Sequence, residues 1–241
     1  MGYKKIIVLL MLFGAFMNVL WGEAKLYEVR SGIIEYAISG GGNIMGMQSE
    51  TDGKRKVVFD EWGTLQIQKE ESVSTTMGQT IKTNSMIKMD NGTVYMVDPD
   101  KKVIIKQSLE MLGQSGSQDM LKMGKEMFDK MGGKKIGSSR VLGYDCEIWE
   151  VMGAKIWIHK GVMLKIQADI MGIKHTEEAV SVKFDVPINR SEFELPDFPV
   201  KTAEEIYGKD LKEKMPSRMP TQEELKQMQE MMKQFGTMPT H

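Results

Sequence analysis

The sequence predicts an α+β protein built on an antiparallel β-sheet, with an inserted methionine-rich helix and a helical C-terminal tail. Three observations predict this class. Residues 25–107 contain short β-prone runs, spaced roughly ten residues apart with no helical pattern between them. Residues 144–186 alternate apolar and polar side chains with period two, which is typical of a sheet with one solvated face. Between these blocks, methionines recur at helical spacing.

Turn residues separate the strands of the first block. Asn91-Gly92 predicts a hairpin, because both central residues of the favoured two-residue turn need positive φ. Gly40-Gly41-Gly42 is predicted to be a flexible turn, and Asp52-Gly53 and Asp98-Pro99-Asp100 are predicted to be further turns. The predicted strands cover residues 26–38, 57–59, 65–69, 80–89, 93–97 and 103–106.

The segment 108–131 is predicted to be a broken or two-part amphipathic helix, which ends at Gly132-Gly133. Its apolar stripe consists of Met120, Leu121, Met123, Gly124, Met127, Phe128 and Met131. We expect this helix to form a lid, because the apolar face of the second strand block needs a cover. That face is predicted to hold Tyr144, Cys146, Ile148, Ile156, Ile158, Val162, Leu164, Ile166, Ala168, Ile170, Val180, Val182, Phe184 and Val186.

The two ends of the chain differ from the middle. Residues 1–24 combine a basic start, an apolar run from Ile6 to Leu20 and small residues at Gly22 and Ala24, which predicts a secretory signal cleaved before Lys25. An uncleaved N-terminal anchor is the alternative, although the run is short for a spanning helix. Residues 201–241 predict a helical, partly flexible tail, in which Thr221–Glu224 forms a capping box that opens a second helix.

Composition excludes several classes of function. A net charge of -1 argues against nonspecific binding of nucleic acid. The single cysteine excludes an intramolecular disulfide framework. With only three histidines and no metalloprotease pair, phosphate-binding loop or nucleophile elbow, the chain is predicted not to be an enzyme, and no cofactor is expected. Cys146 is interpreted as a buried, inert side chain, with an intermolecular thiol as the alternative.

The 23 methionines are several times an ordinary share. Plain core packing, an adaptable apolar binding surface and Cu(I) binding are the three explanations, since thioethers are flexible, polarizable and soft ligands. Helical stripes favour the first two over metal. The copper alternative uses Met-rich segments, Met45-x-Met47 and above all the tail. Its tail ligands would be Met228, Met231, Met232, Met238 and His241.

The second strand block also carries a recognisable order of residues. It runs through Leu142-Gly143-Tyr144-Asp145-Cys146-Glu147-Ile148-Trp149, Ile156-Trp157-Ile158-His159-Lys160-Gly161, Leu164-Lys165, Ala179-Val180 and Phe193-Glu194-Leu195-Pro196. With the predicted signal, Val97-Asp98-Pro99 and Lys101-Lys102, this order resembles exported bacterial proteins related to the LolA-like lipoprotein-carrier superfamily. The resemblance covers about residues 25–200. It implies a curved half-open barrel whose concave face is covered by inserted helices.

The chain departs from the carriers in three ways. No arginine can be assigned to the carrier's lid-locking role, Cys146 lies inside the motif, and residues 201–241 form an extra tail.

The predicted signal, the apolar strand faces and the methionine-rich helix together predict a periplasmic, non-catalytic protein that binds an acyl chain or a hydrophobic polypeptide segment. The expected ligand is a lipid or lipoprotein-like molecule, and a protein of the outer or inner membrane is the expected partner. An assembly protein that docks through the tail helix is a further alternative. The predicted pocket and lid residues are Tyr144, Cys146, Ile148, Ile156, Ile158, Leu164, Ile166, Val180, Val182, Phe184, Met120, Met123, Met127 and Phe128.

Overall fold

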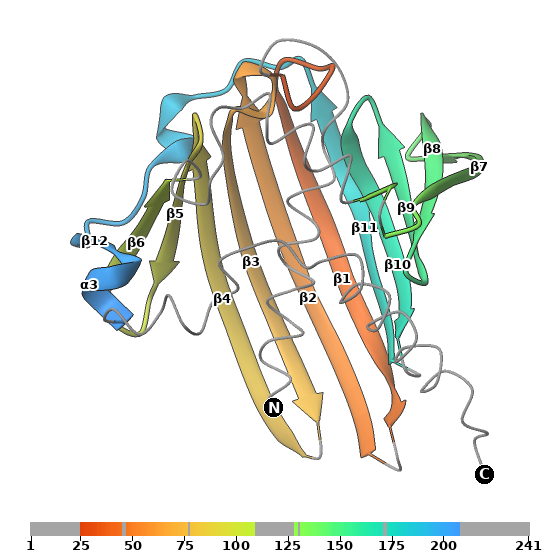
Figure 1. Cartoon of the computed structure of the whole chain (residues 1–241), viewed down its shortest axis with the longest axis horizontal. Coiled ribbons are helices and arrows are strands. Elements are labelled where there is room, and N and C mark those ends of the chain that lie inside the picture. The colour runs from red at the N-terminus through yellow and green to blue at the C-terminus, as the bar shows by residue number, and fades with distance from the viewer. Residues whose placement is uncertain are drawn as a thin grey trace.

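A single curved sheet organises the chain (Figure 1). The computed structural model describes residues 25–44, 47–76, 78–108, 128–129, 131–170 and 173–207. Twelve strands form one sheet in the order β12-β6-β5-β4-β3-β2-β1-β11-β10-β9-β8-β7. The first six are β1 (Gly32–Ile44), β2 (Met47–Asp60), β3 (Leu65–Thr76), β4 (Gln79–Asp90), β5 (Thr93–Asp98) and β6 (Val103–Ser108). The others are β7 (Lys134–Val141), β8 (Tyr144–Val151), β9 (Ala154–His159), β10 (Val162–Ile170), β11 (Ile173–Phe184) and β12 (Val200–Thr202).

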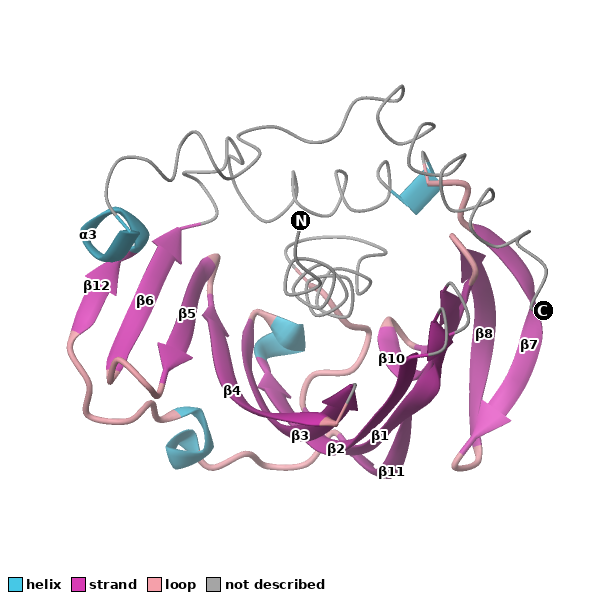
Figure 2. Cartoon of the chain, turned by 90° about the horizontal axis from the view of Figure 1, so that it is seen from below, coloured by secondary structure: helices cyan, strands magenta, loops and turns pink. Residues whose placement is uncertain are grey.

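The sheet consists of two meanders that meet in its middle. Strands β1 to β6 follow one another in one direction, and β7 to β11 follow one another back, so that β11 pairs with β1. All neighbouring strands are antiparallel except β12 and β6, which are parallel. Figure 2 shows that the sheet curves into an open trough, with β4–β6 on one side and β8–β10 on the other. The predicted curved antiparallel sheet, a half-open barrel, is confirmed.

Tight turns connect the strands, and the sequence predicted two of them, at Asn91-Gly92 and at Asp98-Pro99-Asp100. Asn91 and Gly92 have φ of 46° and 82°, which confirms the predicted hairpin. The pairs Leu142-Gly143, Met152-Gly153 and Lys160-Gly161 adopt the same two positive φ values. Leu, Met and Lys seldom occupy this region. The glycine that follows each of them was therefore the only signal for these hairpins.

The chain before β1 closes one end of the trough. The predicted strand 26–38 begins only at Gly32, because residues 26–30 bind to other loops instead. The backbone N–H groups of Leu26 and Tyr27 donate to the carbonyl of Trp62 at 2.8 and 2.9 Å, in the short 3-10 helix η1 (Glu61–Gly63). The ring of Tyr27 packs edge-on against Phe59 with centroids 4.5 Å apart. This segment thus lies over the end of the concave face.

The opposite, convex face is covered near the same end by residues 186–199. They contain the 3-10 helix η3 (Arg190–Phe193), which Asn189 caps through its side-chain oxygen. Phe193 is buried in a cluster with Val58, Leu65 and Ile67. Figure 2 shows η3 outside the curve of the sheet.

Gly40-Gly41-Gly42 and Gly53 lie inside strands and not in turns, which corrects the prediction for these four glycines. Gly40, Gly41 and Gly42 pair with both β2 and β11. Gly53 lies in β2, where an added Cβ would come within 2.6 Å of Ser72 Cβ and 2.7 Å of the Glu71 carbonyl oxygen. Close approach of neighbouring backbones, and not a reversal of the chain, explains these glycines.

Little of the predicted helical structure lies within the described residues. Phe128 and Asp129 are helical, and α3 (Ala203–Tyr207) lies near the start of the tail, residues 201–241, that was predicted to be helical. Most of the predicted lid, the N-terminal signal and residues 208–241 lie outside the described residues. Of the helices that the structure describes, none is long and apolar enough to cross a membrane.

The close approach at Gly53 predicts that Gly53→Ala destabilises the fold by about 1–3 kcal/mol, because a methyl group there must push two strands apart. The measurement is urea unfolding of residues 25–241. Gly137→Ala on edge strand β7 is the matched control, since no atom lies within 4 Å of its added Cβ. Equal midpoints for the two variants would contradict this explanation.

Candidate functional site

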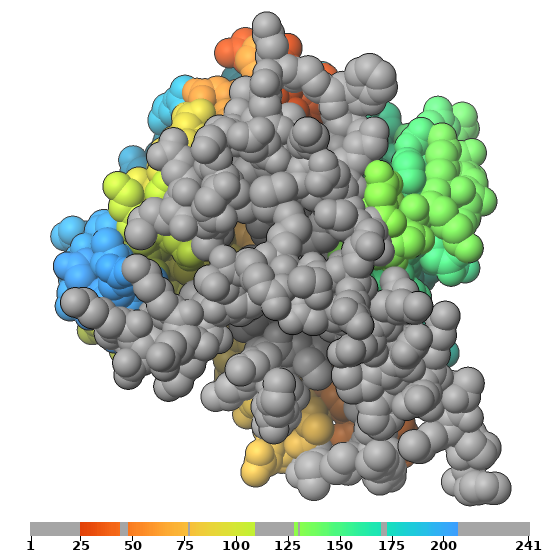
Figure 3. Space-filling view, in the orientation of Figure 1, coloured from red at the N-terminus to blue at the C-terminus, as the bar shows by residue number. Residues whose placement is uncertain are grey.

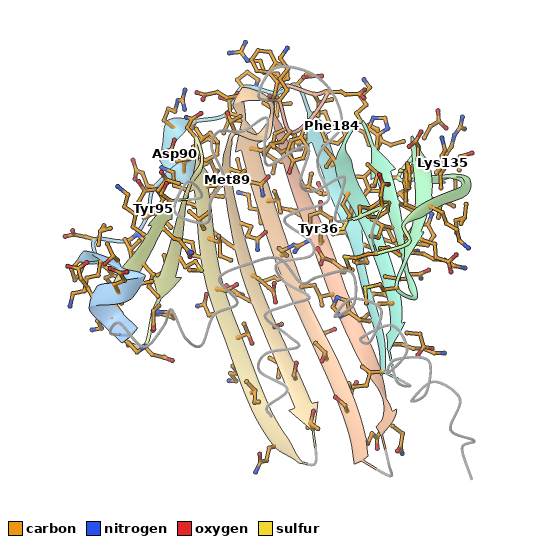
Figure 4. All side chains as sticks on the ribbon, in the orientation of Figure 1. Tyr36, Met89, Asp90, Tyr95, Lys135 and Phe184 are labelled. Carbon is orange, nitrogen blue, oxygen red and sulfur yellow. The ribbon has the colours of Figure 1, made fainter. Side chains whose placement is uncertain are left out.

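Strand register brings one row of polar side chains together on the concave face. Tyr36 pairs with Arg55, Arg55 with Glu70, and Glu70 with Ser85, across β1 to β4. Paired residues in antiparallel strands share a face. The row belongs to the same face as Phe59, against which the N-terminal segment packs, and this face lies inside the curve (Figure 2). In Figure 4, Tyr36 lies near the middle of the sheet.

Three charged residues occupy the concave face of the seven strands β1–β4 and β9–β11. Among the Lys, Arg, Asp and Glu residues of β1–β4 and β9–β11, the register places only Arg55, Glu70 and Glu177 there. Each is at most 6% exposed. The other charged side chains of these strands point to the convex face, where Lys54 pairs with Glu71 at 3.0 Å. We call Arg55, Glu70 and Glu177 the charged belt.

The belt spans four strands. The Arg55 guanidinium forms an ion pair with Glu177 on β11 and lies 5.0 Å from the centroid of the Tyr36 ring. The hydroxyl of Tyr36 donates to the carbonyl of Met163 at 2.7 Å. Ser72 donates to Glu70 at 3.3 Å. These contacts hold the belt across the middle of the sheet.

Burial changes the protonation of the belt. It raises the pKa of Glu177 to about 7 despite the opposing charge of Arg55. Burial also raises the pKa of Glu70, again against the effect of Arg55. His175 lies two residues before Glu177 on the same face, and burial together with Arg55 lowers its pKa. Near pH 7, the Glu177 carboxyl therefore changes between its protonated and its ionised form, whereas His175 stays neutral.

Toward the end closed by the N-terminal segment, the concave face is a filled core. Ile34, Phe59 and Leu164 are fully buried there, together with Leu26 and Tyr27. Tyr144, Cys146, Val182 and Phe184 belong to or pack against this cluster. The Tyr144 and Phe184 rings are 5.2 Å apart. Figure 4 shows Phe184 and Met89 toward this end of the sheet.

Two apolar walls rise on either side of the belt. On β9 and β10, Ile156 pairs with Ile166, which in turn pairs with Glu177 of the belt. On the other side, Ile87, Met96 and Ile105 form a row across β4, β5 and β6. The first wall packs against Met131 and Phe128. Figure 3 shows β7–β9 in green and α3 with β12 in blue at opposite flanks of the molecule.

Beyond the belt, the concave face carries small side chains. Ser49 and Thr76 share a hydrogen bond of 3.0 Å, and Thr51 and Ser74 share one of 2.9 Å. Gly53 and Gly40 lie on the same face by register. The concave face thus changes from apolar, through charged, to hydroxyl-rich along its length.

The residues predicted from sequence divide between two clusters. Tyr144, Cys146, Leu164, Val182 and Phe184 lie in the filled core. A second cluster, which includes the wall on β9 and β10, contains Ile156, Ile158, Ile166 and Phe128. Ile148 pairs with Trp157, whereas Ile156 pairs with Trp149, so Ile148 and Ile156 point to opposite faces. This corrects the single apolar face predicted for β8 and β9.

Val180 also differs from the prediction, because it is 57% exposed. The pairing of β1 with β11 passes from Ser181 to Ala179, which makes Val180 the extra residue of a β-bulge. The bulge reverses the alternation, so Glu177 and Ala179 share a face with Val182 and Phe184. The belt was missed for the same reason: alternation alone puts Glu177 on the face opposite Val182.

Metal binding finds no support in the described part of the chain. No group of three or more His, Cys, Asp or Glu side chains there could hold a metal ion. The copper ligands Met228, Met231, Met232, Met238 and His241 lie outside the described residues, as do Met120, Met123 and Met127 of the predicted lid.

Comparison with known proteins gives structural similarity only. No protein family and no curated protein matches the chain. An uncharacterized conserved protein from Thermus thermophilus aligns with 70% of this chain and 90% of its own, at 9% identity and a TM-score of 0.40. A LolA superfamily protein from Nitrosomonas europaea aligns with 78% of this chain and 97% of its own, at 9% identity and a TM-score of 0.32. A putative outer membrane lipoprotein-sorting protein domain from Vibrio parahaemolyticus covers 68% of this chain and 89% of its own, at 11% identity and a TM-score of 0.28.

At these TM-scores the fold is established by the strand order and register of this chain itself.

Burial of Cys146 predicts an unreactive thiol. Its side chain is 2% exposed, its Sγ–H donates to the carbonyl of Tyr144 at 3.4 Å, and burial raises its pKa. A disulfide reagent at pH 8 should label native Cys146 roughly a hundredfold more slowly than the urea-unfolded chain. Ser138→Cys, on exposed strand β7, supplies a reactive control thiol. Equal rates for the two thiols would refute the buried position.

The raised pKa of Glu177 predicts a pH-dependent stability. Between the ordinary value of 4.5 and about 7, the folded chain holds a proton that the unfolded chain has lost. The free energy of unfolding should therefore fall by roughly 2 kcal/mol as pH rises through this window. Glu177→Gln should flatten the profile measured by urea unfolding. Glu70 and His175 titrate in both proteins, so the difference between profiles isolates Glu177, and parallel profiles would contradict the assignment.

Proposed function

We propose that this protein is a periplasmic, non-catalytic binding protein that holds an acyl chain or a hydrophobic polypeptide segment against the concave face of its sheet. The observation that carries the proposal is the pair of apolar walls on that face. Ile156 and Ile166 lie on one wall, and Ile87, Met96 and Ile105 lie on the other. The signal-like residues 1–24 and the motif resemblance to LolA-like carriers support export and this class of ligand.

The filled core limits where such a chain lies. Tyr27 and Phe59 occupy the closed end, so the chain would lie between the walls, beside the belt and toward the hydroxyl-rich end. Each methylene that leaves water on binding contributes about 0.8 kcal/mol. Several methylenes between the two walls therefore supply enough free energy for a stable complex. Met96 and Met131 suit a ligand of variable shape, because thioether side chains are flexible and polarizable.

Substitutions on the wall of β4 and β5 test the proposal. Met96→Gln and Ile87→Gln, on partly buried side chains, should each weaken binding of N-phenyl-1-naphthylamine, an uncharged fluorescent probe, by about 10-fold through lost apolar contact. The protein is the mature chain, residues 25–241, and the measurement is a fluorescence titration.

Val180→Gln is the matched control, because Val180 is 57% exposed in the β11 bulge. It should bind the probe like the unmodified chain. Equal weakening by all three substitutions, or no saturable binding by the unmodified chain, would contradict the proposed site.

A further inference from the structure

The charged belt contains more negative than positive charge. Glu70 and Glu177 carry two carboxylates, and Arg55 carries the one guanidinium that the concave face of β1–β4 and β9–β11 offers. Arg55 forms its ion pair with Glu177, on the side away from Glu70. A carboxylate buried without a full countercharge is costly to the folded state. Glu70 is therefore the member of the belt that an added cation would stabilise most.

Two buried polar atoms beside Glu70 lack a hydrogen-bond partner among the described residues. One is Nε of Arg55, which precedes Glu70 in the row, and the other is Oγ of Ser85, which follows it. Arg55 is 6% exposed. Oγ of Ser85 can accept a hydrogen bond beside a carboxylate, whereas Nε–H of Arg55 needs an acceptor. Buried polar atoms normally have partners, so unpaired atoms at one place indicate an absent group.

We propose that the belt binds the head group of the ligand, and that this head group is a primary ammonium with a hydrogen-bond acceptor next to it. The ammonium donates to the Glu70 carboxylate and to Ser85 Oγ, and the neighbouring acceptor receives Nε–H of Arg55. This inference rests on the proposed function, because the apolar chain attached to the head group lies along the walls. It makes the protein selective for cationic amphiphiles.

The charges of the belt disfavour an anionic head group. An anionic head group would meet two carboxylates, and the guanidinium that it would need already pairs with Glu177. The other charged or titratable groups facing the belt do not change this balance. Tyr27 and Tyr36 are buried phenols with raised pKa values, and His175 is held neutral by its lowered pKa.

The test compares three amphiphiles with the same ten-carbon chain. Decylamine, decanol and decanoate displace N-phenyl-1-naphthylamine from residues 25–241 at pH 8, below their aggregation concentrations. Decylamine should bind roughly tenfold more tightly than decanol, because a charge-assisted hydrogen bond in a buried site adds to chain burial. Decanoate should bind more weakly than decanol.

Glu70→Gln should bring decylamine down to the affinity of decanol and leave decanol unchanged. Glu71→Gln is the matched control, since Glu71 is the next residue on the same strand and lies on the convex face, paired with Lys54. Ser85→Ala provides a second variant that keeps the charges and should reduce the preference for decylamine by a few-fold.

The outcomes separate the two proposals. If decylamine and decanol bind equally to the unmodified chain, or if Glu70→Gln leaves the preference intact, the head-group inference is overturned while the chain-binding function stands. If neither the probe nor decanol binds, the proposed function fails and the inference fails with it. A decanoate preference would assign the belt to an anionic head group and overturn the inference.

Discussion

The pairing of β1 with β11 is the constraint on which the rest of the structure depends. Every other antiparallel contact in the sheet joins strands that follow each other in the chain, so each forms locally. The pair from Gly32↔Phe184 to Gly42↔Ile173 alone joins the two meanders. Because it closes a long stretch of chain, it carries a large loop-closure cost and must be stabilised by what packs on it. The N-terminal core and the Arg55–Glu177 ion pair both lie across this seam.

The Arg55–Glu177 ion pair alone does not explain the stability of the fold. Removing two charges from water costs several kcal/mol, and well-packed apolar residues in their place are often as stable or more so. The apolar side chains of Ile34 and Phe59, buried completely on the same face, already supply the packing that the seam needs. A charged belt in the middle of a face whose other side chains on β1–β4 and β9–β11 are uncharged near pH 7 is therefore better explained by recognition of a ligand. The bulge at Val180 is what turns Glu177 toward Arg55.

Much of the fold follows from the sequence, and the candidate site follows only in part. Period-two alternation correctly predicted strands within β8, β9 and β10, and Asn91-Gly92 correctly predicted a hairpin. Alternation cannot reveal a bulge, because one extra residue exchanges the two faces without changing the composition of the strand. This is why Val180 was placed inside.

The sequence also does not show how strands that are far apart in the chain pair with one another. Arg55, Glu70 and Glu177 come from three separate strands whose charged residues look alike in sequence, and only the pairings of β1, β2, β3 and β11 bring them together. Glycine-rich stretches misled for a different reason. Gly40 and Gly53 are required by neighbouring strands that approach closely, and sequence does not distinguish this need from that of a turn.

Tryptophan quenching by a nitroxide-labelled alkyl chain tests the central claim, binding of an apolar chain on the concave face, most directly. Trp149 pairs with Ile156 on the wall, whereas Trp157 pairs with Lys165 on the other face of the sheet. In variants of residues 25–241 that retain one of these tryptophans and carry Phe at the others, the chain should quench Trp149 saturably and leave Trp157 nearly unchanged. Equal quenching of the two, or quenching of Trp157 alone, would contradict binding on the concave face.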